Sequence, residues 1–269
     1  MRLAVIILFI GAVAFFGYVK YTANKEADSS VPVISGSTEP LMVSCDYSEQ
    51  DLLEGLTAYD EKDGDITDKI MVGHLSRFYE DGICKAEYVV FDSSNQPAVF
   101  TREIRFVDYQ PPRFELSSPL VFVKGSKSYA SAQIGAVDMI DGDISSFIRM
   151  RSSDVDYSVP GHYDVGVEIT NSFGDYSEID LPVHIIEASD NNLKISLTEN
   201  IVYLRKEAKF NARSYIESVT KSNGEELEKN IVSIESNVDT DKEGCYEVKY
   251  IAQDSTGKKG VTWLVVVVE

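Results

Sequence analysis

The chain has 269 residues with 43% hydrophobic side chains, the composition of a globular protein long enough for two or three small domains. Its 25 Lys and Arg stand against 44 Asp and Glu, a formal net charge of -19, so the surface repels the phosphates of nucleic acids and of anionic lipids. We therefore exclude nucleic acid as a main ligand, and the three cysteines are too few for a scaffold built on disulfides.

An apolar run with no charged residue occupies positions 3–19 and is followed by Lys20. A helix of this length is about 25 Å long, close to the ~30 Å hydrocarbon core of a bilayer. Tyr18 and Tyr21 lie where aromatic side chains border a membrane. We expect a transmembrane signal-anchor helix over residues 3–21 that crosses the cell membrane once, with the N-terminus inside and the acidic bulk of the chain outside.

A cleaved signal peptide is the alternative interpretation of the same run. Signal cleavage requires small residues three positions and one position before the cut. A cut after Ala23 would place Tyr21 at the first of these positions, and a cut after Ala27 would place Asn24 there. We therefore expect the run to be retained, with residues 22–31 as a polar linker to the first domain.

Internal similarity with a period near 80 residues is the strongest pattern in the chain, and such a period is too long for a solenoid and typical of tandem domains. The first copy contains AYDEKDGDIT at 58–67 and the second contains AVDMIDGDIS at 136–145, whereas the third has NGE at 223–225. In every copy an Asp or Asn follows a glycine by ten residues: Asp92 after Gly82, Asn171 after Gly161, and Asp254 after Gly244.

The segment after each of these glycines alternates between apolar and polar side chains, as a half-buried antiparallel strand does. The turn sequences DSSN, NSFG and DSTG follow, and a second β-rich segment follows each turn. The side chains predicted to face inward are Cys84, Ala86, Tyr88 and Val90 in the first copy, Tyr163, Val165, Val167 and Ile169 in the second, and Tyr246, Val248, Tyr250 and Ala252 in the third. About seven short strands in each copy indicate an all-β fold of β-sandwiches.

The pattern P-x-[IF]…D-x-x-D-G-D-I-[TS]…G-x-[YC]…[DN]-S-x-[GN] resembles the bacterial immunoglobulin-like repeats of Gram-positive surface proteins, which also occur in some pesticidal crystal proteins. The first two copies match over residues 32–187, whereas the third matches only in its latter half and lacks the DGD and the inter-domain proline. The resemblance implies extracellular sandwiches used as spacers or binding modules, and it carries no catalytic residues. We therefore predict three tandem immunoglobulin-like β-sandwiches after the transmembrane helix: domain 1 at residues 32–108, domain 2 at 109–187 and a divergent domain 3 at 193–269.

The residue types that enzymes use are scarce and scattered in this chain. The three histidines, His74, His162 and His184, lie in separate places without metal-ligand spacing, and we expect each to be solvated. The sequence also lacks a glycine-rich phosphate loop, a G-x-S-x-G nucleophile motif and an H-E-x-x-H motif. We therefore expect no enzymatic activity, no catalytic residues and no bound cofactor.

Three aspartates within six residues recur around a glycine in the first two copies, as Asp60, Asp63 and Asp65 and as Asp138, Asp141 and Asp143. Carboxylates at this spacing can supply part of a calcium shell, although the twelfth-position glutamate of an EF-hand is missing. Alternatively, the glycine supplies a positive φ and the aspartates cap the turn. We favour the turn, because the third copy keeps the glycine and loses most of the charge, and calcium binding is the alternative.

Two cysteines depart from the repeat pattern in the same domain. Cys84 takes an inward place where the other copies have tyrosine, and Cys45 lies at a position where the second copy has glycine. We predict a disulfide between Cys45 and Cys84, provided that their strands face each other across the sandwich; two buried thiols are the alternative. The side chain of Cys245 is expected to face away from its core and to stay unpaired.

Together these features favour a membrane-anchored, non-enzymatic extracellular protein that presents immunoglobulin-like domains as binding or spacer modules, for instance in adhesion. Its expected partners are the membrane, through the N-terminal helix, and an extracellular protein or glycan. The alternative function is that of an ectodomain subunit in a cell-envelope sensor or assembly complex.

For the apolar run, we predict that the mature protein keeps residues 1–30, because no favourable cleavage site follows the run. Intact-mass measurement or N-terminal sequencing of the protein isolated from its native membranes checks this. A mature N-terminus anywhere between Asn24 and Val31 would contradict it.

Overall fold

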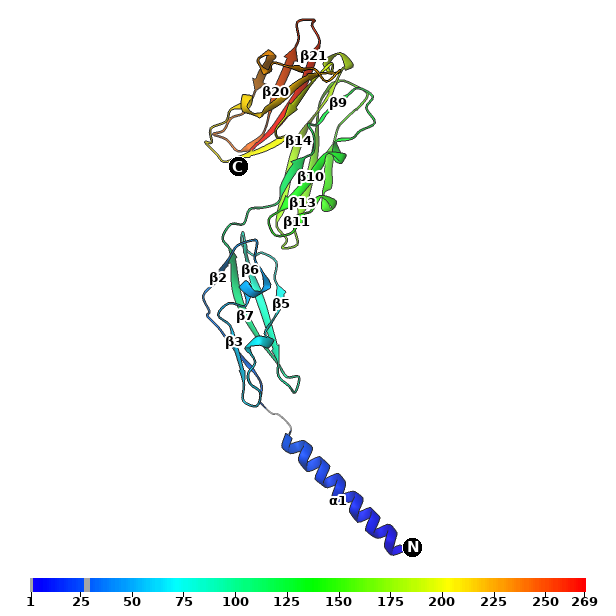
Figure 1. Ribbon diagram of the computed structural model, residues 1–269, viewed down its shortest axis with the longest axis vertical. Coiled ribbons are helices and arrows are strands. Elements are labelled where there is room, and N and C mark those ends of the chain that lie inside the picture. Colours follow the sequence, from blue (N-terminus) through cyan, green and yellow to red (C-terminus); the bar gives the residue numbers. More distant parts are fainter. Residues whose placement is uncertain (1, 27–29) are drawn as a thin grey trace. The chain divides into compact units, whose positions relative to one another are not determined.

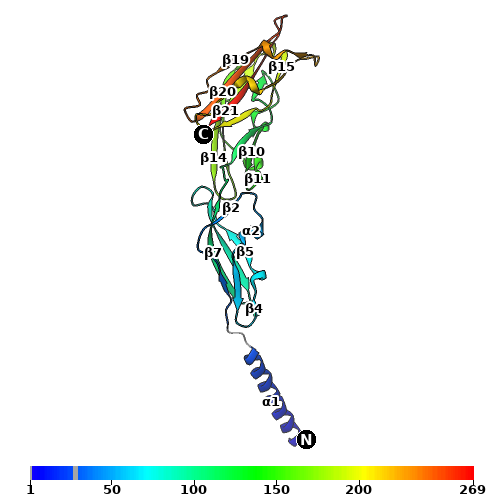
Figure 2. The same ribbon diagram turned by 60° about the vertical axis from the view of Figure 1, so that its left-hand side comes forward.

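The computed structural model describes residues 2–26 and 30–269, with side chains described for residues 8–21 and 30–269. The chain forms two compact units, Met1–Val107 and Asp108–Glu269, and strands dominate both (Figure 1, Figure 2). Unit 1 holds one β-sandwich and unit 2 holds two, and we number these sandwiches first, second and third in chain order. The predicted all-β class with three pairs of sheets is confirmed.

The helix α1 (Arg2–Glu26) contains the apolar run. Every side chain described in it is exposed, and those of Leu8, Phe9 and Phe15 are exposed by 74%, 68% and 71%. Among the residues that the structure describes, no helix is long and apolar enough to cross a membrane. Positions 3–7 of the predicted anchor lie outside the residues with described side chains.

Each sandwich packs a three-stranded sheet against a four-stranded sheet. The first sandwich consists of β1 (Val33–Ser35), β2 (Leu41–Val43), α2 (Glu49–Leu52), β3 (Thr57–Asp60), β4 (Gly64–Asp65), the 3-10 helix η1 (Thr67–Lys69), β5 (Met71–Leu75), β6 (Ile83–Phe91) and β7 (Pro97–Phe106). The second consists of β8 (Arg113–Leu116), β9 (Val121–Val123), η2 (Ala130–Ala132), β10 (Ile134–Asp138), β11 (Gly142–Asp143), η3 (Ser145–Phe147), β12 (Arg149–Ser153), β13 (Gly161–Thr170) and β14 (Tyr176–Ile186). The third consists of η4 (Ala188–Asp190), β15 (Leu193–Leu197), β16 (Ile201–Leu204), η5 (Ala212–Tyr215), β17 (Ile216–Lys221), β18 (Glu226–Leu227), η6 (Lys229–Ile231), β19 (Val232–Ser236), β20 (Gly244–Gln253) and β21 (Lys259–Val268).

The three sandwiches share one topology. Their three-stranded sheets have the orders β1-β3-β4, β8-β10-β11 and β15-β17-β18. Their four-stranded sheets have the orders β2-β7-β6-β5, β9-β14-β13-β12 and β16-β21-β20-β19, and the first strand of each order pairs parallel with the second. A long antiparallel hairpin therefore forms the centre of each four-stranded sheet.

The inward faces of these hairpins are the ones that the alternation predicts. On β6, Ala86, Tyr88 and Val90 are fully buried, and the equivalent residues of β13 and β20 are buried or partly buried. The buried hydroxyl of Tyr88 donates to the carbonyl of Leu52 at 2.8 Å, at the end of α2. The predicted inward side chains are confirmed in all three copies.

A buried arginine lies in the core of the first sandwich. Arg102 on β7 is only 5% exposed, and its guanidinium lies over the ring of Tyr88. Nη2 donates to the carbonyl of Leu52 at 2.6 Å, and Nη1 donates to that of Glu54 at 2.8 Å. A cation is favourable here because the last carbonyls of a helix carry partial negative charge and have no partner within the helix.

The predicted disulfide between Cys45 and Cys84 is not formed in the described structure, although both residues are buried. Cys84 lies on β6 and Cys45 lies just after β2, so the two strands belong to one sheet with β7 between them and do not face each other across the sandwich. Two strand spacings are about 9.6 Å, more than the ~7 Å that a disulfide tolerates between Cα atoms. Burial raises the pKa of the Cys84 thiol to about 11, which keeps it protonated and unreactive at neutral pH. Cys245 on β20 is exposed.

The second and third sandwiches meet at a junction within unit 2. Val265 on β21 is 3% exposed and packs in the hydrophobic core cluster of the second sandwich. The hydroxyl of Tyr203 on β16 accepts the backbone N–H of Phe114 at 2.9 Å and lies 3.2 Å from its carbonyl. Asn200 Nδ2 donates to the carbonyl of Leu116 at 2.9 Å. Apolar packing and backbone hydrogen bonds therefore join the two sandwiches.

Gly260 provides a test of how closely the chain packs where the third sandwich begins. A Cβ at Gly260 would lie 2.1 Å from the carbonyl oxygen of Leu193 and 2.7 Å from its carbonyl carbon, and backbone atoms cannot move aside cheaply. We expect Gly260→Ala to lower the free energy of unfolding of unit 2 by about 2–4 kcal/mol. Urea unfolding of the full chain in a nonionic detergent, followed by the fluorescence of Trp263, the one tryptophan of the sequence, measures this.

The matched control is Ser255→Ala, which changes an exposed side chain in the adjoining loop. It should alter the free energy of unfolding by less than about 0.5 kcal/mol. If Gly260→Ala unfolds at the same urea concentration as the parent, the conclusion that Gly260 packs closely against the Leu193 carbonyl is contradicted.

Candidate functional site

The acidic turns of the first two sandwiches have the same hydrogen bonds. Asp60 ends β3 and Asp138 ends β10, and their exposed fractions are 1% and 6%. In each copy Oδ1 accepts two backbone N–H groups of the following turn, at 2.9 and 3.0 Å. Gly64 and Gly142 follow with φ of +75° and +69°, values that favour glycine. These contacts agree with the interpretation that the aspartates cap the turn and the glycine supplies the positive φ.

The other aspartates of the motif tie each turn to its surroundings. Both carboxylate oxygens of Asp63 accept from Ser93, its N–H at 2.5 Å and its Oγ at 2.7 Å. Asp141 accepts in the same way from Ser172, at 2.6 and 2.7 Å. The hydrogen bonds from the Ser93 side chain and amide hold the pKa of Asp63 below its ordinary value. Asp65 and Asp143 each accept a backbone N–H two residues on, from Thr67 and Ser145.

The two acidic turns differ in how fully their buried carboxylate is satisfied. In the second sandwich, Asn171 Nδ2 donates to Asp138 Oδ2 at 3.0 Å. In the first sandwich the residue equivalent to Asn171 is Asp92, which follows β6 and is 5% exposed. There, Oδ2 of Asp60 is buried and has no hydrogen-bond partner in the described structure. Among the described residues, no three of the six candidate calcium ligands have their ligand atoms within 4.8 Å of one another. Calcium binding therefore stays an untested alternative.

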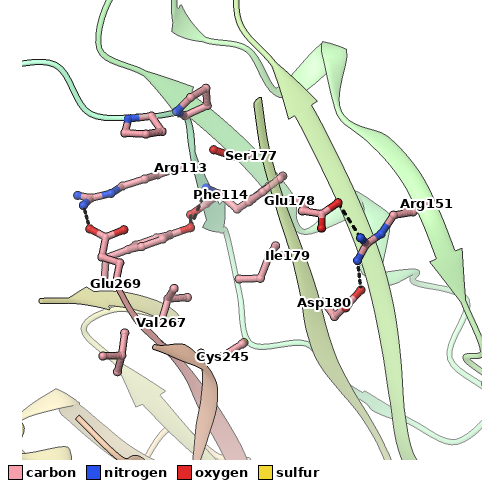
Figure 3. Close-up of a pocket in the computed structure, with 15 residues that line it drawn as sticks. Arg113, Phe114, Arg151, Ser177, Glu178, Ile179, Asp180, Cys245, Val267 and Glu269 are labelled. Carbon is pink, nitrogen blue, oxygen red and sulfur yellow. Dashed lines mark hydrogen bonds and ion pairs between the residues drawn. The ribbon is translucent and has the colours of Figure 1, made fainter. Parts of the chain in front are cut away.

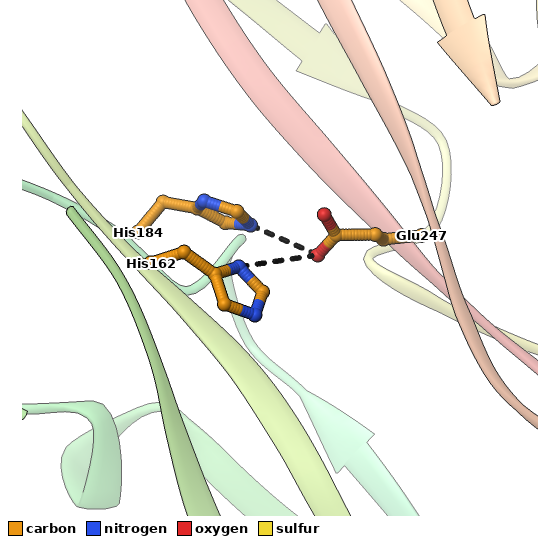
Figure 4. Close-up of side chains that lie close together, drawn as sticks. All are labelled: His162, His184 and Glu247. Carbon is orange, nitrogen blue, oxygen red and sulfur yellow. Dashed lines mark hydrogen bonds and ion pairs between the residues drawn. The ribbon is translucent and has the colours of Figure 1, made fainter. Parts of the chain in front are cut away.

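A different set of side chains converges at the junction of the second and third sandwiches. Because β13 and β14 pair antiparallel, His162 lies directly opposite His184, and Glu247 on β20 reaches toward both rings (Figure 4). His184 Nε2 is 2.9 Å from Glu247 Oε2, and His162 Nδ1 is 4.0 Å from the same oxygen. The ligand atoms of all three residues lie within 4.8 Å of one another, an arrangement that can hold a metal ion.

The surroundings hold this cluster in place. The side chain of His184 is only 8% exposed and stacks on Trp263, with ring centroids 3.8 Å apart and planes at 9°. His162 is 53% exposed, and its Nε2 lies 3.8 Å from Asp164 Oδ1. Burial raises the pKa of Glu247, but the hydrogen bond with His184 and the electrostatic interactions with His184, His162 and Lys249 outweigh this and hold that pKa below its ordinary value. Glu247 is therefore a carboxylate at neutral pH.

The expectation that the three histidines lie in separate places is wrong for His162 and His184. The expectation that each is solvated is also wrong for His184, which is buried, whereas His74 and His162 are exposed. The register of the hairpin could have revealed the pair, because His162 lies eight residues before Thr170 and His184 eight residues after its partner Tyr176. Glu247 could not have been found in this way, since it belongs to another sandwich.

A cavity of about 430 Å³ lies at the same junction, further along β14 (Figure 3). Its volume is within the range of small-molecule sites. The charged side chains that line it are already paired with one another: Arg113 with Glu269, and Arg151 with Glu178 at 2.7 Å and with Asp180 at 2.6 Å. We therefore interpret the cavity as part of the contact between the sandwiches, with both of its arginines paired to carboxylates of the chain.

Residues 198–266, which span most of the third sandwich, match the family described as "Bacterial surface protein, Ig-like domain". The predicted family resemblance is confirmed. The matching segment is the copy that departs most from the repeat motif. The other two bacterial surface Ig-like copies predicted from the sequence have the same strand topology as this one.

Two relatives extend the similarity beyond the third sandwich. The pesticidal crystal protein Cry22Aa of Bacillus thuringiensis is 31% identical over 212 residues, which cover 76% of this chain and 28% of that protein. An uncharacterized 81.3 kDa protein of Acholeplasma phage L2 is 33% identical over 138 residues, covering 49% of this chain and 18% of that protein. The chain thus spans less than a third of the length of either relative.

The similarity of this chain to solved structures is weak. The Drosophila N-cadherin EC1-3 structure covers 91% of this chain and 90% of its own, with 11% identity and a TM-score of 0.30. That score is too low to carry a conclusion about this chain.

For the acidic turns, we predict that calcium has little effect on stability. A site with a dissociation constant of ~10 µM would add about 2.7 kcal/mol at 1 mM calcium and raise the melting temperature of a unit the size of unit 2 by roughly 5–10 °C. Because turn donors already occupy the Asp141 carboxylate, we expect a rise of less than about 2 °C. Thermal unfolding of the full chain in calcium and in a calcium chelator measures it. A large rise that Asp141→Asn abolishes would make the turn a calcium site.

Proposed function

We propose that this chain is a non-enzymatic bacterial surface protein that carries Ig-like domains outside the cell as a spacer or binding module, held to the membrane by its N-terminal helix. The match of residues 198–266 to the bacterial surface Ig-like family is the observation that carries the proposal. The repetition of one seven-stranded topology three times supports it, because tandem sandwiches extend a surface protein without requiring a catalytic centre.

The junction in unit 2 supports the spacer role. A chain of domains joined by free linkers bends at every linker, and it spaces poorly. Here the second and third sandwiches are joined by Val265, packed in the core cluster of the second, and by hydrogen bonds from Tyr203 and Asn200 to β8. These contacts favour two sandwiches that move as one body.

The exposed apolar side chains of α1 support the membrane attachment. Residues 8–21 are exposed all round the helix, and no part of the described chain covers them. An apolar helix with no protein surface packed on it is stable in lipid and is unfavourable in water. The acidic charge of the remaining chain fits an extracellular location and argues against binding to nucleic acid or anionic lipid. An extracellular protein or glycan is the expected partner class.

The test expresses the full chain with a C-terminal tag in a bacterial host. We expect the protein to stay with membranes after an alkaline wash and its tag to be removed by protease added to intact cells. Two charges placed in the helix by Ile10→Lys and Val13→Lys should shift the protein to the soluble fraction, because each Lys near the centre of a membrane helix costs about 2.5–3.5 kcal/mol.

The control carries Ile10→Leu and Val13→Leu, which keep the helix apolar, and it should behave as the parent does. Release of the parent protein by the wash would overturn the anchor. Protection of the tag in intact cells, with digestion only after lysis, would overturn the extracellular location.

A further inference from the structure

We propose that His162, His184 and Glu247 form a zinc site that bridges the second and third sandwiches. Two of the ligands come from the hairpin of the second sandwich and one comes from β20 of the third (Figure 4). A bound ion would therefore link two sandwiches that otherwise meet through packing and hydrogen bonds. This proposal does not depend on the membrane attachment or on the partner of the protein.

Two of the three distances between ligand atoms are close to those of a zinc site, and all three lie within 4.8 Å. Zinc binds nitrogen and oxygen ligands at about 2.0–2.1 Å in a tetrahedron, which places the ligand atoms about 3.3 Å from one another. His184 Nε2 and Glu247 Oε2 are 2.9 Å apart, and His162 Nδ1 is 4.0 Å from Glu247 Oε2. The first distance has to open by about 0.4 Å and the second has to close by about 0.7 Å. The exposed ring of His162 can make that adjustment by a small rotation.

The type of ligand selects the class of metal. Two imidazole nitrogens and one carboxylate suit zinc and the neighbouring transition metals, whereas calcium and magnesium prefer oxygen ligands alone. Three protein ligands leave the fourth position of the tetrahedron for water, and His162 lies on the solvent side of the cluster. The net charge of -19 also favours the approach of a divalent cation.

The residues behind the ligands include a carboxylate and an aromatic ring next to the two histidines. A histidine ligand usually directs its other ring nitrogen to a carboxylate, a carbonyl or water. His162 presents Nδ1 to the cluster, and its Nε2 faces Asp164 Oδ1 at 3.8 Å. The ring of His184 is fixed by stacking on Trp263, so this ligand is held in place before any ion binds.

Trp263 gives the site its own reporter, because it is the one tryptophan of the sequence and it stacks on a ligand. The full chain in nonionic detergent is freed of metal with a chelator and titrated with zinc chloride, with millimolar calcium present to occupy nonspecific acidic sites. We expect a saturable change of Trp263 fluorescence at one zinc per chain. His162→Ala and Glu247→Gln should each weaken zinc binding by about 100-fold or more, since loss of an outer-shell partner alone weakens metal sites 10–100-fold.

The matched control is His74→Ala, which removes the exposed histidine of unit 1 and should leave the titration unchanged. Titration with cobalt gives a second readout, since a tetrahedral cobalt site absorbs visible light, and His162→Ala should abolish that absorption. Near-ultraviolet circular dichroism verifies that each variant is folded, and His162→Ala decides the test if Glu247→Gln is not.

Three results would overturn the proposal. The first is the absence of a saturable fluorescence change in the parent. The second is a folded His162→Ala variant that binds zinc or cobalt as the parent does. The third is a loss of binding in His74→Ala equal to that in His162→Ala, which would indicate nonspecific binding to the acidic surface.

Discussion

The antiparallel register of the long central hairpin determines most of this structure. In each sandwich an Asp or Asn at the end of the first hairpin strand accepts backbone N–H groups of the turn: Asp92 from Ser94 and Gln96, Asn171 from Asp175, and Asp254 from Thr256 and Lys258. Side chains alternate between the two faces of a strand, so a slip by one residue would move every core side chain to the outer face. These turns hold the hairpin in register, and the register in turn fixes both faces of the sheet.

The sandwiches differ in whether the outer face of their central hairpin is covered. In unit 2 the outer face of β21 and that of β14 at His184 are buried, because the second and third sandwiches pack on each other. β21 is consequently buried on both faces from Thr262 to Val266, and its sequence is a continuous apolar run instead of an alternating one. In the first sandwich Val99 and Thr101 of β7 are exposed, whereas Ala98 and Phe100, on the other face of the strand, are partly buried. The outer face of β7 is therefore open within unit 1.

The sequence was sufficient for everything that depends on local periodicity. The hairpins, their inward faces and the acidic turns follow from alternation and from glycine and Asx positions. The sheet to which a short strand belongs is a non-local property, so the position of β2 beside β7, which separates Cys45 from Cys84, could not be predicted. Arg102 also occupies a core position against its residue type, because the carbonyls of Leu52 and Glu54 bind its guanidinium. The apolar run of β21 was the one available signal for the covered outer face.

At the junction, apolar burial and polar contacts have different effects: burial stabilises the contact, and the polar groups fix its orientation. Removing the Val265 side chain and the ring of Trp263 from water supplies favourable free energy without fixing an orientation, because apolar contacts are not directional. An ion pair that is partly buried contributes little net stability but has one good geometry. The hydrogen bond of His184 with Glu247 and the ion pair of Arg113 with Glu269 both cross the junction and thus provide the directional contacts. These directional contacts bring two imidazoles and a carboxylate together at the junction, and the same three groups are the ligands of the proposed metal site.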